Sequence, residues 1–148
     1  MSTLAGVFMA AAALAGGQAD RPDAEIVIGR SAQGRPIRAL RVGSPRARVE
    51  LLVVGVVHGN EQAGRAVVRR LRARRPPRGT ALWLIEDANP DGTAAGSRHN
   101  ANGVDLNRNF PYRWRGGGPS PLSEPESTVF TKLVKRIRPR VTIWYHQH

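Results

Sequence analysis

The amino-acid sequence predicts an α/β fold, because apolar runs of strand length alternate with segments of helical periodicity. The run VELLVVGVV at 49–57 has no polar break after Glu50 and is typical of a strand covered on both faces. The segment that follows it places apolar residues at helical spacing. With 148 residues, the chain is long enough for one domain with a buried core.

Four further strands are predicted around this first one. Residues 25–31 and 35–43 are strand-like and flank a turn-rich stretch with Gly34 in its loop, which predicts a hairpin. The runs TALWLIE at 80–86 and RVTIWYH at 140–146 each predict a later strand.

Two helices are predicted between these strands. The first begins after Glu61 and is expected to end at the two prolines at 76–77. At the second helix, Ser123 and Glu126 have the spacing of a capping box, which would open the helix. The apolar face of this second helix comprises Val129, Phe130, Leu133, Val134 and Ile137.

Two polar segments, 87–103 and 113–127, are rich in turn residues and predict long loops. The stretch NPDG at 89–92 is interpreted as a turn that shapes the first loop. Three glycines at 116–118 lack the pattern of a phosphate-binding loop, so they predict flexibility only.

The amino-acid composition excludes some kinds of binding site and limits the possible partners. The chain has no cysteine, which excludes disulfides and thiolate metal sites, so any metal must be held by His, Asp or Glu. There are 23 basic and 11 acidic residues, a formal net charge of +12. No recognition helix, RNA-binding aromatic motif or zinc-finger spacing accompanies this charge, which favours a solvated surface over a nucleic-acid partner. Attraction to an acidic polymer such as a cell wall is the second interpretation.

The first 19 residues resemble an export signal. An apolar segment from Leu4 to Leu14 precedes the small residues Gly17 and Ala19, which are typical of a cleavage site, although no Lys or Arg comes before it. We therefore expect a signal peptide at 1–19 and a mature domain at 20–148, secreted or held in the cell envelope. The apolar segment is too short for a stable membrane span.

Two histidines follow predicted strands. His58 directly follows the run at 49–57, Glu61 lies at the start of the next helix, and His146 lies at the end of the last strand. In α/β sheets, ligands collect beyond the carboxyl ends of the strands, so these three side chains are expected to converge. Two imidazoles and a carboxylate are the ligands of a catalytic zinc site with one open position. The spacing of His58 and Glu61 alone is weak evidence, since Glu61 also suits a helix amino terminus.

Ordered motifs strengthen this hypothesis. The sequence resembles the zinc carboxypeptidase family, the carboxypeptidase A-like M14 peptidases, from about Gly29 to its last residue, and looks most like the bacterial branch that cleaves murein peptides and γ-D-glutamyl-diaminopimelate bonds. The motifs are HGNE at 58–61, NPDG at 89–92, NANGVDLNRNFP at 100–111, SEPE at 123–126 and WYH at 144–146. The resemblance implies the N-terminal half of a mixed-sheet sandwich with helices on both faces.

The resemblance also implies roles for individual residues. His58, Glu61 and His146 would bind one Zn²⁺ per chain, with His148 a poorer candidate for the third ligand because it lies beyond the matched segment. Asp105 would orient the first zinc histidine. The remaining implied roles concern a peptide substrate: Asn107 and Arg108 would grip its terminal carboxylate, and Arg98 would stabilise the oxyanion.

One part of the family pattern has no match. The catalytic glutamate and the tyrosine that covers the substrate come from segments beyond the third zinc ligand, so this chain corresponds to a partial M14 domain, and its own turnover is expected to be poor. The last strand is then expected to form an exposed apolar edge.

Alternatives remain open. A zinc deacylase similar to aspartoacylase or succinylglutamate desuccinylase shares the HGNE and DLNRxFP patterns. A module that binds wall peptides without cutting them, and a basic nucleic-acid binder, are the other two. The sequence does not predict the oligomeric state.

Overall fold

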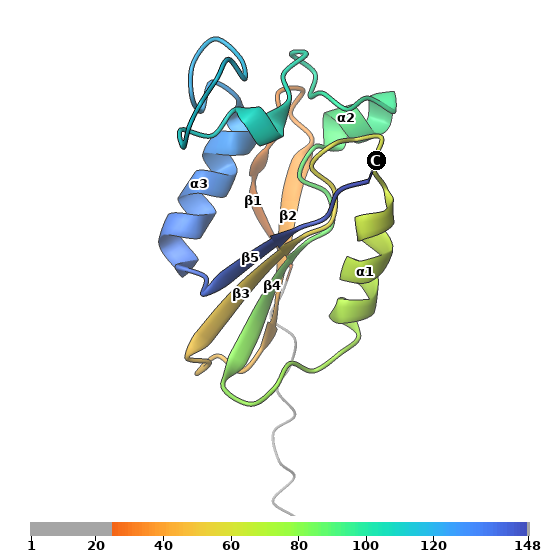
Figure 1. The fold of residues 1–148 in the computed structure, drawn as a ribbon. Coiled ribbons are helices and arrows are strands. Elements are labelled where there is room, and N and C mark those ends of the chain that lie inside the picture. Colours follow the sequence, from red (N-terminus) through yellow and green to blue (C-terminus); the bar gives the residue numbers. More distant parts are fainter. Residues whose placement is uncertain (1–24, 148) are drawn as a thin grey trace, which may run out of the picture.

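The computed structural model describes residues 25–147, which fold into one five-stranded sheet flanked by helices (Figure 1). The expected signal peptide, residues 1–19, lies outside the described residues, as does His148. The strands are β1 (Ile26–Arg30), β2 (Pro36–Gly43), β3 (Val49–Val54), β4 (Thr80–Ile85) and β5 (Val141–Trp144); the helices are α1 (Ala63–Arg72), α2 (Pro90–Ala95), the short 3-10 helix η1 (Leu106–Arg108) and α3 (Pro125–Ile137).

The sheet is mixed, in the order β1-β2-β4-β3-β5. The predicted hairpin of β1 and β2 is antiparallel, and β2 also pairs antiparallel with β4. β4, β3 and β5 are parallel, and Val54 lies opposite both Ile85 and Trp144. Three strands therefore end at the same end of the sheet, and the predicted α/β mixed sheet is confirmed.

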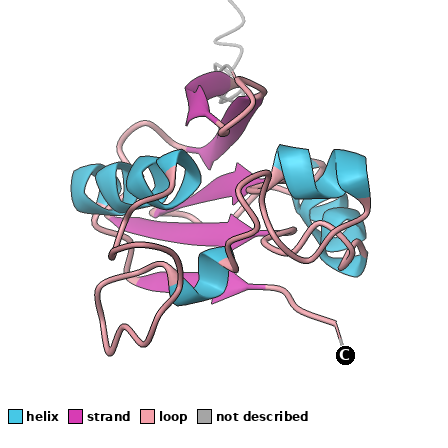
Figure 2. Ribbon diagram, turned by 90° about the horizontal axis from the view of Figure 1, so that it is seen from above, coloured by secondary structure: helices cyan, strands magenta, loops and turns pink. Residues whose placement is uncertain are grey.

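Helices cover both faces of the sheet, as predicted, with α3 on one side and α1 on the other (Figures 1 and 2). Successive side chains of β3 alternate between the two faces. Leu52 and Val54 belong to the core that contains Phe130 of α3, whereas Val53 belongs to the core that contains Val68 of α1. None of the helices between residues 25 and 147 is long and apolar enough to cross a bilayer.

Helix α1 ends at Arg72, before the two prolines that were expected to stop it. The backbone N–H of Arg74 donates to the carbonyl of Leu71 at 3.0 Å, so the last turn tightens into bonds of 3-10 type. Arg75 precedes Pro76, and a residue before proline is disfavoured in helical conformation. The chain therefore leaves the helix a few residues ahead of the proline itself.

The segment predicted as a loop at 87–103 contains helix α2, which is a correction. Asn89 caps it by accepting a hydrogen bond from the backbone N–H of Gly92 at 2.9 Å. Pro90 occupies the first turn, and Gly96 ends the helix at a φ of 60°. These are ordinary helix start and stop signals. The turn interpretation overlooked them because only six residues separate the two caps.

The predicted capping box of α3 is wrong. Glu124, not Ser123, is the N-cap, and its side chain makes no capping hydrogen bond. Glu126 instead accepts hydrogen bonds from the backbone N–H of Ala32 at 3.0 Å and from Asn100 Nδ2 at 3.2 Å. Both glutamates are buried, so donors from distant loops replace the local bonds that the spacing suggested.

Strand β5 lies at one end of the sheet order, and its outward side chains are exposed. Val141 is 48% exposed and Ile143 is 42% exposed. The expected apolar edge is therefore present in the described part of the chain.

Glycines let the loop after β3 lie directly on α2. A Cβ added at Gly59 would lie 1.9 Å from the backbone carbon of Gly92, and one added at Gly64 would lie 2.0 Å from the carbonyl oxygen of Gly55. Contacts this close are open only to residues without a side chain. The position of the HGNE loop thus depends on backbone packing against backbone.

We expect Gly59→Ala to lower the free energy of unfolding by about 3 kcal/mol or more, because backbone cannot yield to the added methyl group as a side chain would. Urea denaturation of both proteins measures the difference. The control is Gly34→Asn, at a φ of 79° in open space, where the cost should stay below about 1 kcal/mol. Equal losses would contradict the close-packing argument.

Asp91 ties helix α2 to the β1–β2 turn. Its buried carboxylate accepts hydrogen bonds from Ser31 Oγ at 2.8 Å, the Gln33 backbone N–H at 2.9 Å and Arg35 Nη1 at 2.6 Å. Burial alone would raise the pKa of Asp91, but the bonds from Gln33, Arg35 and Ser31 outweigh it and hold that pKa below its ordinary value of 3.8. The carboxylate is therefore ionised at neutral pH.

Replacing this carboxylate should cost stability in a pH-dependent way. The unfolded Asp91 binds its proton more readily than the folded one, so its contribution is present above about pH 4 and disappears as the pH falls further. We expect Asp91→Asn to lower the free energy of unfolding by about 2–4 kcal/mol at pH 7. In thermal melts, its melting temperature should fall less steeply below about pH 4 than that of the unchanged protein.

The control is Asp87→Asn, which breaks the partly exposed pair with Arg65 and should cost only about 1 kcal/mol. If the melting temperature of Asp91→Asn fell as steeply below about pH 4 as that of the unchanged protein, the role given to Asp91 would be contradicted.

Candidate metal centre

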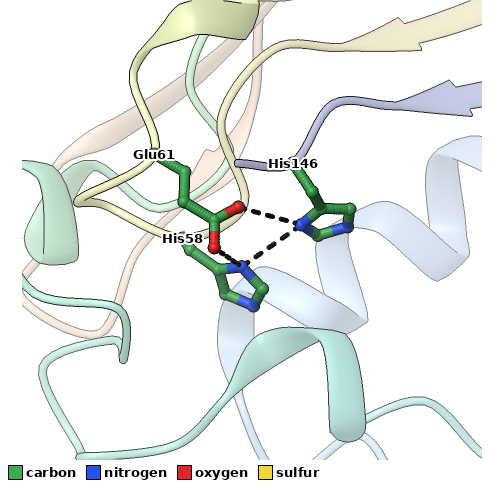
Figure 3. Close-up of side chains that lie close together, drawn as sticks. All are labelled: His58, Glu61 and His146. Carbon is green, nitrogen blue, oxygen red and sulfur yellow. Dashed lines mark hydrogen bonds and ion pairs between the residues drawn. The ribbon is translucent and has the colours of Figure 1, made fainter. Parts of the chain in front are cut away.

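His58 and Glu61 lie on the short loop between β3 and α1. The backbone N–H of Glu61 donates to the carbonyl of His58 at 2.9 Å, which closes a tight turn. Both side chains are almost fully buried, at 1% and 5% exposure, and they point toward one another (Figure 3). The loop therefore presents an imidazole and a carboxylate together at the carboxyl end of the sheet.

His146 arrives from the neighbouring strand β5. Its Nδ1 lies 3.1 Å from Glu61 Oε2 and 3.2 Å from His58 Nδ1, and His58 Nδ1 lies 2.9 Å from Glu61 Oε1 (Figure 3). The structure thus brings together the three residues that the sequence analysis expected as metal ligands, with their ligand atoms within 4.8 Å of one another.

Asp105 lies on the far side of the His58 ring, where His58 Nε2 donates to its Oδ1 at 2.9 Å. Asp105 is also the N-cap of η1, since it accepts the backbone N–H of Asn107 at 2.9 Å. With the proton on Nε2, the lone pair of Nδ1 faces Glu61 and His146. This is the geometry that the expected orienting role of Asp105 requires.

Arg98 reaches the same cluster from the loop after α2. Its Nη1 donates to Glu61 Oε1 at 2.8 Å, and its Nη2 lies 3.2 Å from Asp105 Oδ2. The side chain is 40% exposed, so solvent reaches part of it. Its contacts in this structure are the two carboxylates.

Both carboxylates of the site have lowered pKa values. Burial alone would raise the pKa of Glu61, but the hydrogen bond from the Gln147 backbone, together with those that His58 and His146 donate when protons rather than a metal lie between the rings and the carboxylate, brings it below its ordinary value. For Asp105, burial again opposes ionisation, and the hydrogen bond and charge of His58, with the charge of Arg98, lower the pKa overall. Both groups are therefore available as anions at neutral pH.

Gln147 is a residue of the site that no sequence motif predicts. Its backbone N–H donates to Glu61 Oε2 at 3.0 Å, and its side-chain oxygen accepts the backbone N–H of Ala63 at 2.7 Å. Helix α1 has no capping bond from Gln62, so Gln147 satisfies one of its free amides while fixing Glu61. No local pattern identified it, because both partners are more than eighty positions away in the sequence.

Asn107 and Arg108, expected to grip a substrate, lie on η1 beside Asp105. Asn107 is half-buried, while Arg108 is exposed and Nη1 of its guanidinium donates to the carbonyl of Asn107 at 3.3 Å. Gly117, interpreted only as a flexible position, packs against the Arg108 backbone, where an added Cβ would lie 2.2 Å from it. The tight contact corrects that interpretation.

Other ionisable groups of this region lie apart from the cluster. His99 is exposed, and its backbone N–H donates to Ser97 Oγ at 3.0 Å. Glu124 accepts hydrogen bonds from Asn100 and Asn102, each at 2.7 Å. Glu124 and Glu126 form no bond with the candidate metal ligands.

The donor set fits a zinc ion. Zinc bonds of about 2.0–2.2 Å in tetrahedral geometry separate neighbouring ligand atoms by roughly 3.3 Å. The three contacts among His58, Glu61 and His146 measure 2.9–3.2 Å. The two imidazole nitrogens and the ionised carboxylate face one another with lone pairs. Such lone pairs repel unless a shared cation or protons lie between them.

Comparison with known proteins supports this interpretation. The model of a protein family described as zinc carboxypeptidase matches residues 11–147. Murein peptide amidase A of Escherichia coli K12 is 32% identical over 139 residues, covering 80% of this chain and 57% of the amidase. The chain therefore spans a little over half the length of that relative.

Solved structures of similar proteins share this fold. Murein-tripeptide amidase MpaA from E. coli O157 superposes with a TM-score of 0.70 at 30% identity, over 85% of this chain and 61% of the amidase. Carboxypeptidase A from Helicoverpa armigera superposes with a TM-score of 0.71 over 84% of this chain and 41% of the other, and at 23% identity it supports the fold alone.

We expect Asp105→Ala to weaken binding of a divalent metal by about 10- to 100-fold, because His58 would lose the bond that fixes its ring and tautomer. Competition against a chromophoric chelator measures the affinity. The control is Asp87→Ala, a carboxylate that pairs with Arg65 away from the cluster and should leave the affinity unchanged. Equal affinities of the two variants would contradict the orienting role of Asp105.

Proposed function

Because the chain belongs to the zinc carboxypeptidase family, we propose that it binds one Zn²⁺ through His58, Glu61 and His146 and is part of a hydrolase acting on peptide bonds near a free carboxylate. The observation that carries this proposal is the convergence of these three side chains, with Asp105 behind the first, at the carboxyl ends of β3 and β5.

Residues around the proposed zinc ligands would hold them in position. Asp105 holds the proton on His58 Nε2 so that Nδ1 is free as a ligand. Gln147 fixes Glu61 through its backbone N–H. A bound Zn²⁺ would polarise the scissile carbonyl and lower the pKa of a water molecule.

Arg98 is the group that we propose for stabilising negative charge on the substrate. Its guanidinium already lies against the cluster and is partly open to solvent. A carbonyl oxygen that becomes negative during hydrolysis would find a fixed positive charge there. To serve it, Arg98 would exchange part of its contact with Glu61 for the substrate.

Asn107 and Arg108 are proposed to hold the terminal carboxylate of the substrate. The planar guanidinium binds a carboxylate through two parallel hydrogen bonds. Arg108 is exposed and makes no ion pair with any residue between 25 and 147, so a carboxylate would meet no competing acid. The contact with Gly117 holds the backbone of Arg108 in place.

Proton transfer is the step for which the described residues around the metal site offer no uncommitted carboxylate. Glu61 and Asp105 are both committed to the histidines, and Glu124 and Glu126 are buried in the asparagine network. Hydrolysis needs a carboxylate that accepts the proton of water and passes it to the leaving amine. We therefore propose that the 148-residue chain binds zinc and peptide but turns substrate over slowly.

Murein peptides are the proposed substrates, and the cell envelope or the exterior is the proposed location. The similarity to murein peptide amidase A supports the first, and the apolar start of the sequence, followed by small residues, supports the second. A peptide ending in diaminopimelate offers the free carboxylate that Arg108 would bind.

Metal analysis of the purified chain tests the core of the proposal. We expect about one zinc per chain, lost in His58→Ala and retained in His99→Ala, an exposed histidine outside the cluster. Absence of zinc from the unchanged protein, or its retention in His58→Ala, would overturn the assignment.

Binding and hydrolysis assays extend this test to the substrate. A γ-D-glutamyl-diaminopimelate peptide should bind only in the presence of zinc, more weakly to Arg108→Ala, and should be hydrolysed slowly. Cleavage of an N-acyl amino acid without action on the peptide would point to a deacylase instead. Rapid peptide hydrolysis would disprove the proposed lack of a proton acceptor.

A further inference from the structure

An open cavity lies at the end of the sheet opposite the metal centre. It has a volume of about 640 Å³ and lies between the carboxyl end of α1, the segment 73–79 and the facing ends of β2 and β4. In Figure 1 the segment 73–79 runs below the sheet, whereas the carboxyl ends of β3 and β5 point upward. From this cavity we infer a binding site for a phosphate-bearing polymer, independent of the proposed hydrolase function.

The lining of the cavity is strongly basic. Arg72, Arg74, Arg75 and Arg78 contribute to it, and no acidic residue does. Arg72 reaches Glu25 at 3.5 Å in a largely exposed pair. For the other three, no ion pair is found among residues 25–147. Several positive charges around one cavity repel one another, and a bound anion would reduce this repulsion.

The turn that carries Arg78 has an ordered backbone. The N–H of Thr80 donates to the carbonyl of Pro77 at 3.0 Å, and Gly79 has a φ of 80°, as a tight turn requires at its third residue. The carbonyl of Gly79 then accepts the N–H groups of Arg48 and Val49 at 2.8 and 3.0 Å. The turn that carries Arg78 is thus fixed to the start of β3, which lowers the entropy lost on binding.

The chemistry of the lining selects the class of ligand. Guanidinium groups match phosphate oxygens through paired, charge-assisted hydrogen bonds. The cavity has no aromatic side chain, so it offers no platform on which a nucleic-acid base could stack. Four arginines around about 640 Å³ suit several phosphates in series better than a single ion. A flexible chain of phosphates, inorganic or joined by a polyol, fits these features better than DNA or RNA.

The test uses the full 148-residue chain and the triple variant Arg74→Gln, Arg75→Gln, Arg78→Gln. The matched control is Arg30→Gln, Arg113→Gln, Arg115→Gln, which removes the same charge from exposed positions that do not line the cavity. Three probes of similar charge are titrated at near-physiological salt: a short inorganic polyphosphate, an oligomer of glycerol phosphate, and duplex DNA.

We expect one or both phosphate polymers to bind the unchanged protein and the control variant with affinities within about twofold of each other. The affinity of the cavity variant should be at least about tenfold weaker. Thermal melts should show that the polymer stabilises the first two proteins and not the third. Zinc content should be equal in all three proteins. The probe that binds more tightly identifies the source of the phosphate.

Two results would overturn the inference. An equal loss of affinity in the control would show that net charge alone attracts the polymer. Duplex DNA binding as tightly as the phosphate polymers, with the same dependence on Arg74, Arg75 and Arg78, would assign the cavity to a different ligand.

Discussion

The parallel pairing of β3 with β5 is the interaction on which the metal centre depends. The ladder sets Val54 opposite Trp144, so both strands end at the same level and the chain beyond each delivers a histidine to the same point. His58 and His146 are 88 positions apart in the sequence, and only this ladder brings their Nδ1 atoms within 3.2 Å. Gln147 adds a second link, since it bonds both to Glu61 and to the first amide of α1.

Three buried or half-buried carboxylates near this ladder each accept hydrogen bonds from a distant element. Asp91 joins the β1–β2 turn to α2, Asp105 joins η1 to the loop after β3, and Glu126 joins α3 to the β1–β2 turn. Each carboxylate accepts several hydrogen bonds, because an unpaired charge in the interior would be strongly destabilising. The loops at the carboxyl end of the sheet are therefore fixed to one another by polar contacts, while the two apolar cores hold the helices to the sheet.

The two ends of the sheet have opposite character. Loops at the carboxyl ends of the parallel strands place lowered-pKa carboxylates against histidines and one arginine, which suits a divalent cation. Loops at the other end gather arginines around a cavity without acids. The formal net charge of +12 thus includes a local concentration of positive charge, which an average over the sequence does not show.

The sequence by itself determined the strands, the two long helices, the family and the three candidate ligands, because periodicity and short motifs are local properties. It left α2 unrecognised, although Asn89, Pro90 and Gly96 mark its ends, and it assigned Ser123 and Glu126 to a capping box. Only the tertiary structure decided those partnerships, the role of Gln147 and the basic cavity. The physical reason is that a buried polar group bonds to whichever donor the fold brings nearest, and neighbours in space need not be neighbours in sequence.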